Sequence, residues 1–174
     1  MNKRFAVLTG ITLAAIASRL IPHPPNFSPI AALALFAGAS FASKRAALLV
    51  PLVALFLSDL LLGFYPLAPV VYGSFALIAC LGFWLRPRPS IGRIGSTAFA
   101  GAVLFFVLTN FGVWALGNWY PRTWDGLVAC FVAAIPFFRN TLVSDLCYAA
   151  LLFGILALAQ RRWPVLADTV RTAA

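Results

Sequence analysis

Acidic side chains are almost absent from this sequence, which has four aspartates and no glutamate among 174 residues. With a single histidine beside them, they leave little material for general acid–base catalysis. The sequence also lacks a glycine-rich phosphate-binding loop, a Ser-His-Asp pattern and an HExxH pattern. These absences exclude ATP hydrolysis by a P-loop and make an enzyme a secondary interpretation.

Charged residues of both signs are scarce, and this scarcity decides the class of protein. They make up 10% of the chain, whereas 63% is hydrophobic and the mean hydropathy is +0.96. Soluble domains are roughly half apolar and about a quarter charged. Because a water-exposed surface cannot be built from this composition, we expect an all-α membrane protein.

Long apolar runs occupy most of the chain. A helix that crosses a hydrocarbon core of roughly 30 Å needs about 20 apolar residues, so we expect one membrane domain, 1–174, with six transmembrane helices. A seventh run, 126–138, is short and follows an aromatic stretch, and we interpret it as an interfacial or re-entrant loop. The six helices are expected within 5–21, 27–41, 46–63, 67–85, 95–116 and 141–159.

The basic residues predict the orientation of these helices. The net charge is +9, but the basic residues fall between apolar runs, which indicates membrane topology rather than nucleic-acid binding. Ten of the thirteen occur near the two termini or in the alternate connections at 44–45 and 86–93. Because positive residues favour the cytoplasmic side, we expect both termini in the cytoplasm.

The first apolar run admits two interpretations. Lys3 and Arg4, an apolar stretch and a small-residue motif at 15–17 are typical of a signal peptide. Alternatively, small residues at every fourth position form one stripe along a first helix, namely Ala6, Gly10, Ala14 and Ser18. Such a stripe lets membrane helices approach closely, either within the bundle or against a partner subunit.

Polar residues within the apolar runs gather toward one side of the membrane. Ionisable groups in a bilayer are costly and therefore mark candidate functional sites. In the expected orientation, four informative residues lie near the outer ends of their helices: Arg19, Asp59, Asn110 and Asp145. They predict a cavity open to the outside. Alternatively, Arg19 pairs with Asp59 or Asp145 only to fix helix packing.

Cysteine is sparse as well. Cys80, Cys130 and Cys147 lie far apart and match no zinc or redox spacing, so we expect no disulfide framework. At about 1.5 Å per residue, Cys80 lies roughly 15 Å below the outer end of its helix, near the bilayer midplane. Gly73 and Ala76 lie above it on nearly the same helix face and leave a channel to the thiol. Alternatively, Cys80 is a small buried hydrophobe.

Several segments together resemble one known family. They are 18–29 (SRLIPHPPNFSP), Ser58-Asp59, 71–74 (VYGS) ahead of Cys80, and 109–114 (TNFGVW). Over nearly its whole length the chain is similar to the BtuM family of bacterial cobalamin transporters, relatives of the substrate-binding S-components of energy-coupling-factor (ECF) transporters. The resemblance implies a six-helix, S-component-like bundle in the bacterial inner membrane. It further implies that this multi-pass protein takes up cobalamin, vitamin B12, from the periplasmic side.

The resemblance also implies roles for single residues. It makes the Cys80 thiolate the axial ligand to cobalt, which suits the affinity of soft thiolates for transition metals. Because the family is associated with removal of the cyanide of cyanocobalamin by this thiolate, Cys80 is also the candidate catalytic residue. The other candidate cobalamin contacts are His23, Asn26, Asp59, Tyr72 and Asn110.

The expected partners are a corrinoid and the lipid bilayer, without nucleic acid. An ECF-type energising module is a further candidate partner, which would dock on the small-residue stripe of the first helix. Three other functions stay open: a membrane enzyme that removes the upper ligand of cobalt, a purely structural membrane subunit, and a related transporter for another vitamin or a modified base.

Overall fold

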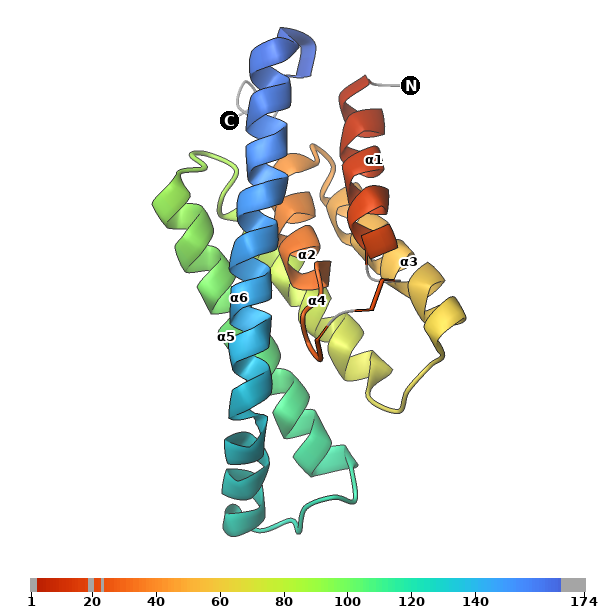
Figure 1. The fold of residues 1–174 in the computed structure, drawn as a ribbon, viewed down its shortest axis with the longest axis vertical. Coiled ribbons are helices and arrows are strands. Elements are labelled where there is room, and N and C mark those ends of the chain that lie inside the picture. Colours follow the sequence, from red (N-terminus) through yellow and green to blue (C-terminus); the bar gives the residue numbers. More distant parts are fainter. Residues whose placement is uncertain (1–2, 19–20, 23, 167–174) are drawn as a thin grey trace.

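The computed structural model describes residues 3–18, 21–22 and 24–166, and the regular structure of these residues is entirely helical (Figure 1). A short 3-10 helix, η2 (Pro164–Leu166), ends the described part of the chain. The six α-helices are α1 (Lys3–Ala17), α2 (Ile30–Ser40), α3 (Lys44–Leu62), α4 (Ala68–Phe83), α5 (Ile91–Leu116) and α6 (Trp124–Arg162). The prediction of an all-α protein with six helices is confirmed.

Capping residues determine where several helices begin and end. The side chains of Ser43, Ser90 and Thr123 precede α3, α5 and α6, and each accepts a hydrogen bond from the backbone N–H three residues later. Such caps satisfy donors that have no partner inside the helix. α3 ends at Gly63, whose φ of 96° favours glycine.

Three of the described helices, α3, α5 and α6, are long and apolar enough to cross a membrane. The shorter apolar helices are α1, α2 and α4. α2 has 11 residues and rises by about 16 Å, roughly half the thickness of a hydrocarbon core. The crossing of the bilayer by all six helices and the cytoplasmic location of the termini stay predictions.

α2 forms the centre of the bundle. Leu33, Ala34 and Phe36 have no exposed surface, and α3, α4 and α6 pack around this helix (Figure 1). α4 approaches most closely, since a Cβ atom added at Gly82 would lie 2.8 Å from the Cα atom of Gly38. Two helix backbones this close require glycine at the crossing point.

Two arginines join the helix ends at the side of the bundle where α1 begins. Arg4 is buried and donates hydrogen bonds to the carbonyl oxygens of Leu166 (2.7 Å) and Ser40 (3.0 Å). Arg86 donates three hydrogen bonds to carbonyl oxygens at the end of α2 and just beyond it. Because the last carbonyls of a helix have no partner inside it, these guanidinium groups cap α2. Arg4 and Arg86 therefore stabilise the bundle in addition to indicating its membrane topology.

The interpretation of 126–138 as an interfacial or re-entrant loop is wrong. Residues 124–162 form one continuous helix, α6, with Pro136 inside it. Proline removes one backbone hydrogen bond from a helix interior. α5 packs along this part of α6, where the ring of Phe106 lies 5.5 Å from that of Phe131 and 4.9 Å from that of Phe138. This packing supports α6 through the proline, and α5 and α6 extend together as a hairpin (Figure 1).

Candidate functional site

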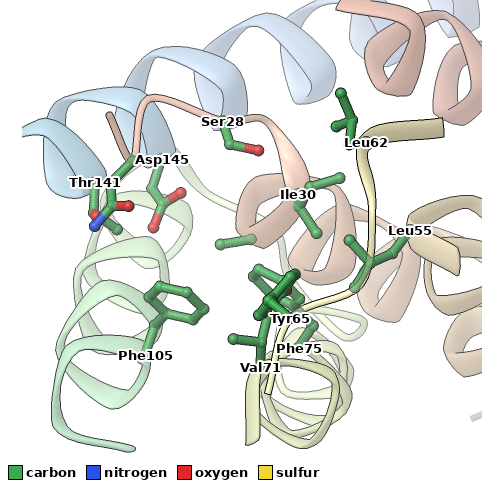
Figure 2. A pocket seen from close by; sticks show the side chains of 12 residues that line it. Ser28, Ile30, Leu55, Leu62, Tyr65, Val71, Phe75, Phe105, Thr141 and Asp145 are labelled. Carbon is green, nitrogen blue, oxygen red and sulfur yellow. The ribbon is translucent and has the colours of Figure 1, made fainter. Parts of the chain in front are cut away.

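A cavity of about 360 Å³, which we call the central cavity, lies beyond the start of α2 (Figure 2). Its volume falls in the range of small-molecule sites, about 300–1,000 Å³. All helices except α1 contribute to its wall, together with the α1–α2 linker and the α3–α4 loop. The lining residues are Asn26, Ser28, Ile30, Ala31, Leu55, Leu62, Tyr65, Val71, Phe75, Phe105, Thr141 and Asp145.

Asp145 is the one ionisable carboxyl group in this wall. Its side chain is 2% exposed, and its Oδ2 atom has no hydrogen-bond partner in the described part of the chain. Figure 2 shows the carboxyl group directed into the space between the lining side chains. One helical turn earlier, Thr141 lines the same cavity, and its hydroxyl donates to the carbonyl oxygen of Phe137 (3.1 Å). α6 therefore presents a polar edge to the cavity, which Asn26 and Ser28 of the α1–α2 linker also border.

Aromatic rings form the opposite part of the wall. Phe75 of α4 and Phe105 of α5 are stacked, with ring centroids 5.0 Å apart and an angle of 17° between their planes. Tyr65, from the α3–α4 loop, also lines the cavity. Both phenylalanine side chains border the cavity, where another ring can pack against them.

The α1–α2 linker is tied to α6 beside the cavity. Ser144 donates a hydrogen bond to the carbonyl oxygen of Ser28 (2.9 Å), and Asn140 donates one to that of Pro25 (3.0 Å). Asn26 lies between these two anchors, with a φ of 60° that asparagine tolerates better than most residues. The anchors hold Asn26 and Ser28 at the cavity wall.

A second cavity of about 230 Å³ adjoins the first between α4, α5 and α6. The two share several lining residues, namely Asn26, Tyr65, Val71, Phe105 and Thr141. Asn110 lines this second cavity, and its Nδ2 atom donates to the carbonyl oxygen of Phe106 (2.7 Å). Asn110 therefore lies at a space that continues from the central cavity.

Apart from Cys80, the residues predicted from the sequence divide into three groups. Asn26, Asn110 and Asp145 line the two cavities. Asp59 is fully buried and accepts a hydrogen bond from the hydroxyl of Tyr72 (2.9 Å), which joins α3 to α4 outside the cavity wall. The other two predicted residues, Arg19 and His23, lie outside the described residues.

Cys80 is placed differently from the expectation. Its side chain is exposed and lines neither cavity. The buried stripe of α4 instead runs through Phe75, Ile78 and Gly82, where the helix packs on α2. A Cβ atom added at Gly73 would meet no other atom within 4 Å, so the expected channel from Gly73 to the thiol opens to the outside of the bundle. The role of Cys80 as a cobalt ligand stays a prediction.

Sequence reasoning missed part of the wall. Thr141 precedes Asp145 by four residues and therefore lies on the same face of α6, a spacing that could have identified it. Phe75 and Phe105 carry no such indication, because phenylalanine is common in all the apolar runs. Within the described residues, no group of three or more His, Cys or acidic side chains is placed to hold a metal ion.

Comparisons with known proteins give one match. A model of a family of unknown function, DUF6580, matches residues 1–166. No curated protein and no solved structure matches the chain.

Proposed function

The chain belongs to the family of unknown function DUF6580, and we propose that it binds a vitamin-type organic molecule in the central cavity and takes it up across a membrane. One observation carries the proposal: polar side chains from the α1–α2 linker and α6 meet at a cavity inside an apolar helical bundle. Polar groups in the membrane-spanning part of a protein commonly mark a substrate path.

Cobalamin is the specific ligand that we propose, because of the resemblance to the BtuM family. In this proposal the protein lies in the bacterial inner membrane and captures the corrinoid from the periplasmic side. Asn26 and Asn110 support it, since they line the two adjoining cavities. Cobalt coordination by Cys80 requires the corrinoid to reach the exposed face of α4, or α4 to turn that face inward. Docking of an energising module on the stripe of α1 is part of the same proposal.

Absorbance spectroscopy of the purified protein tests the ligand and the cysteine separately. The wild-type protein is mixed with cobalamin and passed over a gel-filtration column, and the spectrum of the protein peak is recorded. We expect retained corrinoid with a thiolate–cobalt absorption band, which Cys80→Ala abolishes. Cys147→Ala is the matched control, because Cys147 is also an exposed cysteine, and it should retain the band.

Each outcome has a distinct meaning. Absence of corrinoid from the wild-type peak refutes cobalamin as the ligand. Retention of corrinoid without a thiolate band, in the wild type as in Cys80→Ala, refutes the role of Cys80 and leaves the cavity as the binding site. Uptake of labelled cobalamin into liposomes containing the protein then tests transport itself.

A further inference from the structure

The central cavity contains a carboxyl group that the fold leaves unsatisfied. Oδ2 of Asp145 is buried without a hydrogen-bond partner in the described part of the chain. Ile30 and Ala31, in the first turn of α2, line the same cavity but supply no hydrogen bond to this oxygen. A buried carboxyl group without donors is costly and rare in native structures. A molecule in the cavity can supply the missing donors.

The neighbouring wall determines the shape of such a molecule. Phe75 and Phe105 present stacked rings to the same cavity that Asp145 lines (Figure 2). A flat ring can pack against these two side chains. The two rings therefore favour a planar ligand, and the carboxyl group favours one that is cationic.

The volume determines its size. A space of about 360 Å³ lies near the lower limit of small-molecule sites and admits a ligand of one or two rings. Thr141 and Asn26 line the same space. The hydroxyl of Thr141, which already donates to Phe137, can accept a hydrogen bond at the ligand's edge, and the amide of Asn26 can accept or donate one.

Building on the proposed uptake function, we infer that the central cavity recognises a flat organic cation of one or two rings. Its N–H groups donate to Asp145 while its ring packs against Phe75 and Phe105. The recognised chemistry is that of amidinium, guanidinium or ring-bound ammonium groups, which form charge-assisted hydrogen bonds with a carboxylate. The inference rests on the proposed uptake of a vitamin-type molecule and not on cobalamin as that molecule, since the peripheral side chains of cobalamin end in neutral amides.

Two probes of equal shape test the inference. Benzamidine and benzamide are both flat and nearly equal in size, but only benzamidine carries a cationic group with paired N–H donors. Binding of each to the purified full chain in lipid nanodiscs is measured by calorimetry. We expect benzamidine to bind about tenfold more tightly than benzamide, because a hydrogen bond to a charged group contributes at least that factor.

Matched variants assign the preference to one residue. In Asp145→Asn the ratio of the two affinities should fall to about one. In Asp125→Asn, which removes an exposed carboxyl group at the start of the same helix, it should stay at about ten. Equal affinities in the wild type, or a preference that survives in Asp145→Asn, would overturn the inference. The inference would also be overturned if the wild type were more stable in sodium chloride than in choline chloride and Asp145→Asn lost this difference. That result would show that the Asp145 carboxylate binds a metal ion.

A chemical measurement covers the case in which Asp145→Asn does not fold. Dicyclohexylcarbodiimide modifies buried carboxyl groups, and mass spectrometry locates the modified residue. Benzamidine should protect Asp145 of the wild type from modification, whereas benzamide at the same concentration should not. Modification of Asp145 that benzamidine leaves unchanged overturns the inference.

The uptake assay and the probe measurements separate this inference from the proposed function. If uptake succeeds while the probes show no preference, the inferred cavity chemistry is wrong and the proposed function stands. If uptake fails while the probe preference is preserved, only the proposed function is refuted.

Discussion

Substitution of Gly82 by alanine should weaken the contact between α2 and α4. A Cβ atom at this position would lie 2.8 Å from the Cα atom of Gly38 and 3.0 Å from the backbone nitrogen of Ala39, and closer still to the carbonyl oxygen of Leu35. All three neighbours are backbone atoms of α2, which cannot rotate away as a side chain can. The two helices must therefore separate to admit one methyl group.

Gly73→Ala provides a control on the same helix. A Cβ atom there would meet nothing within 4 Å, so the substitution adds helix propensity and no contact. The gain in propensity, about 1 kcal/mol for glycine to alanine, applies to both variants and cancels in their comparison. The remaining difference in the free energy of unfolding is the cost of overpacking, about 1–3 kcal/mol.

Thermal unfolding of the two purified variants measures this difference. At about 2–4 °C per kcal/mol for a chain of this size, Gly82→Ala should unfold about 2–12 °C below Gly73→Ala. The wild type should lie at or below Gly73→Ala, because that control gains propensity without a clash. Equal midpoints for the two variants, or a higher midpoint for Gly82→Ala, would show that α2 and α4 do not approach as closely as described.

Two further predictions concern the same bundle. Arg86→Gln should lower the free energy of unfolding by about 2 kcal/mol, because it weakens three hydrogen bonds to the carbonyls at the end of α2 and just beyond it. Arg88→Gln, at an exposed site, should change the free energy of unfolding little. Equal effects of the two substitutions in thermal unfolding would contradict the capping role of Arg86. In detergent, a maleimide should label Cys80 and Cys147 rapidly and leave the buried Cys130 unlabelled. Protection of Cys80 in the same mass-spectrometric assay would place its thiol inside the bundle.

The course of the chain through the helices was largely predictable from its apolar runs. The helices expected within 46–63 and 67–85 match α3 and α4 closely. The segment at 126–138 was not, because its apolar run is short and follows an aromatic stretch, while the packing of α5 that supports α6 past Pro136 is a tertiary effect. The sequence alone does not reveal that α5 packs on α6 at this position.

The candidate site was predictable only in its polar members. Asp145, Asn26 and Asn110 stand out because polar groups are rare in this chain, and the structure places all three at the two cavities. The position of Cys80, in contrast, could not be predicted from the sequence. α4 is apolar on all sides, so its sequence tells which residues share a face but not which face turns inward. The glycine contact between α4 and α2 makes that choice, and it turns Cys80 outward.

The shortness of α2 has a consequence for the depth of the cavity. Its 11 residues cover about 16 Å, whereas the 19 residues of α3 cover about 28 Å, so the column beyond the start of α2 has no central helix. Ile30 and Ala31, in its first turn, form the floor of that unfilled column, and the surrounding helices continue past them as its walls. The protein thus obtains a hollow by omitting part of one helix rather than by spreading the others apart, and each helical turn added before Ile30 would make the hollow shallower by about 5 Å.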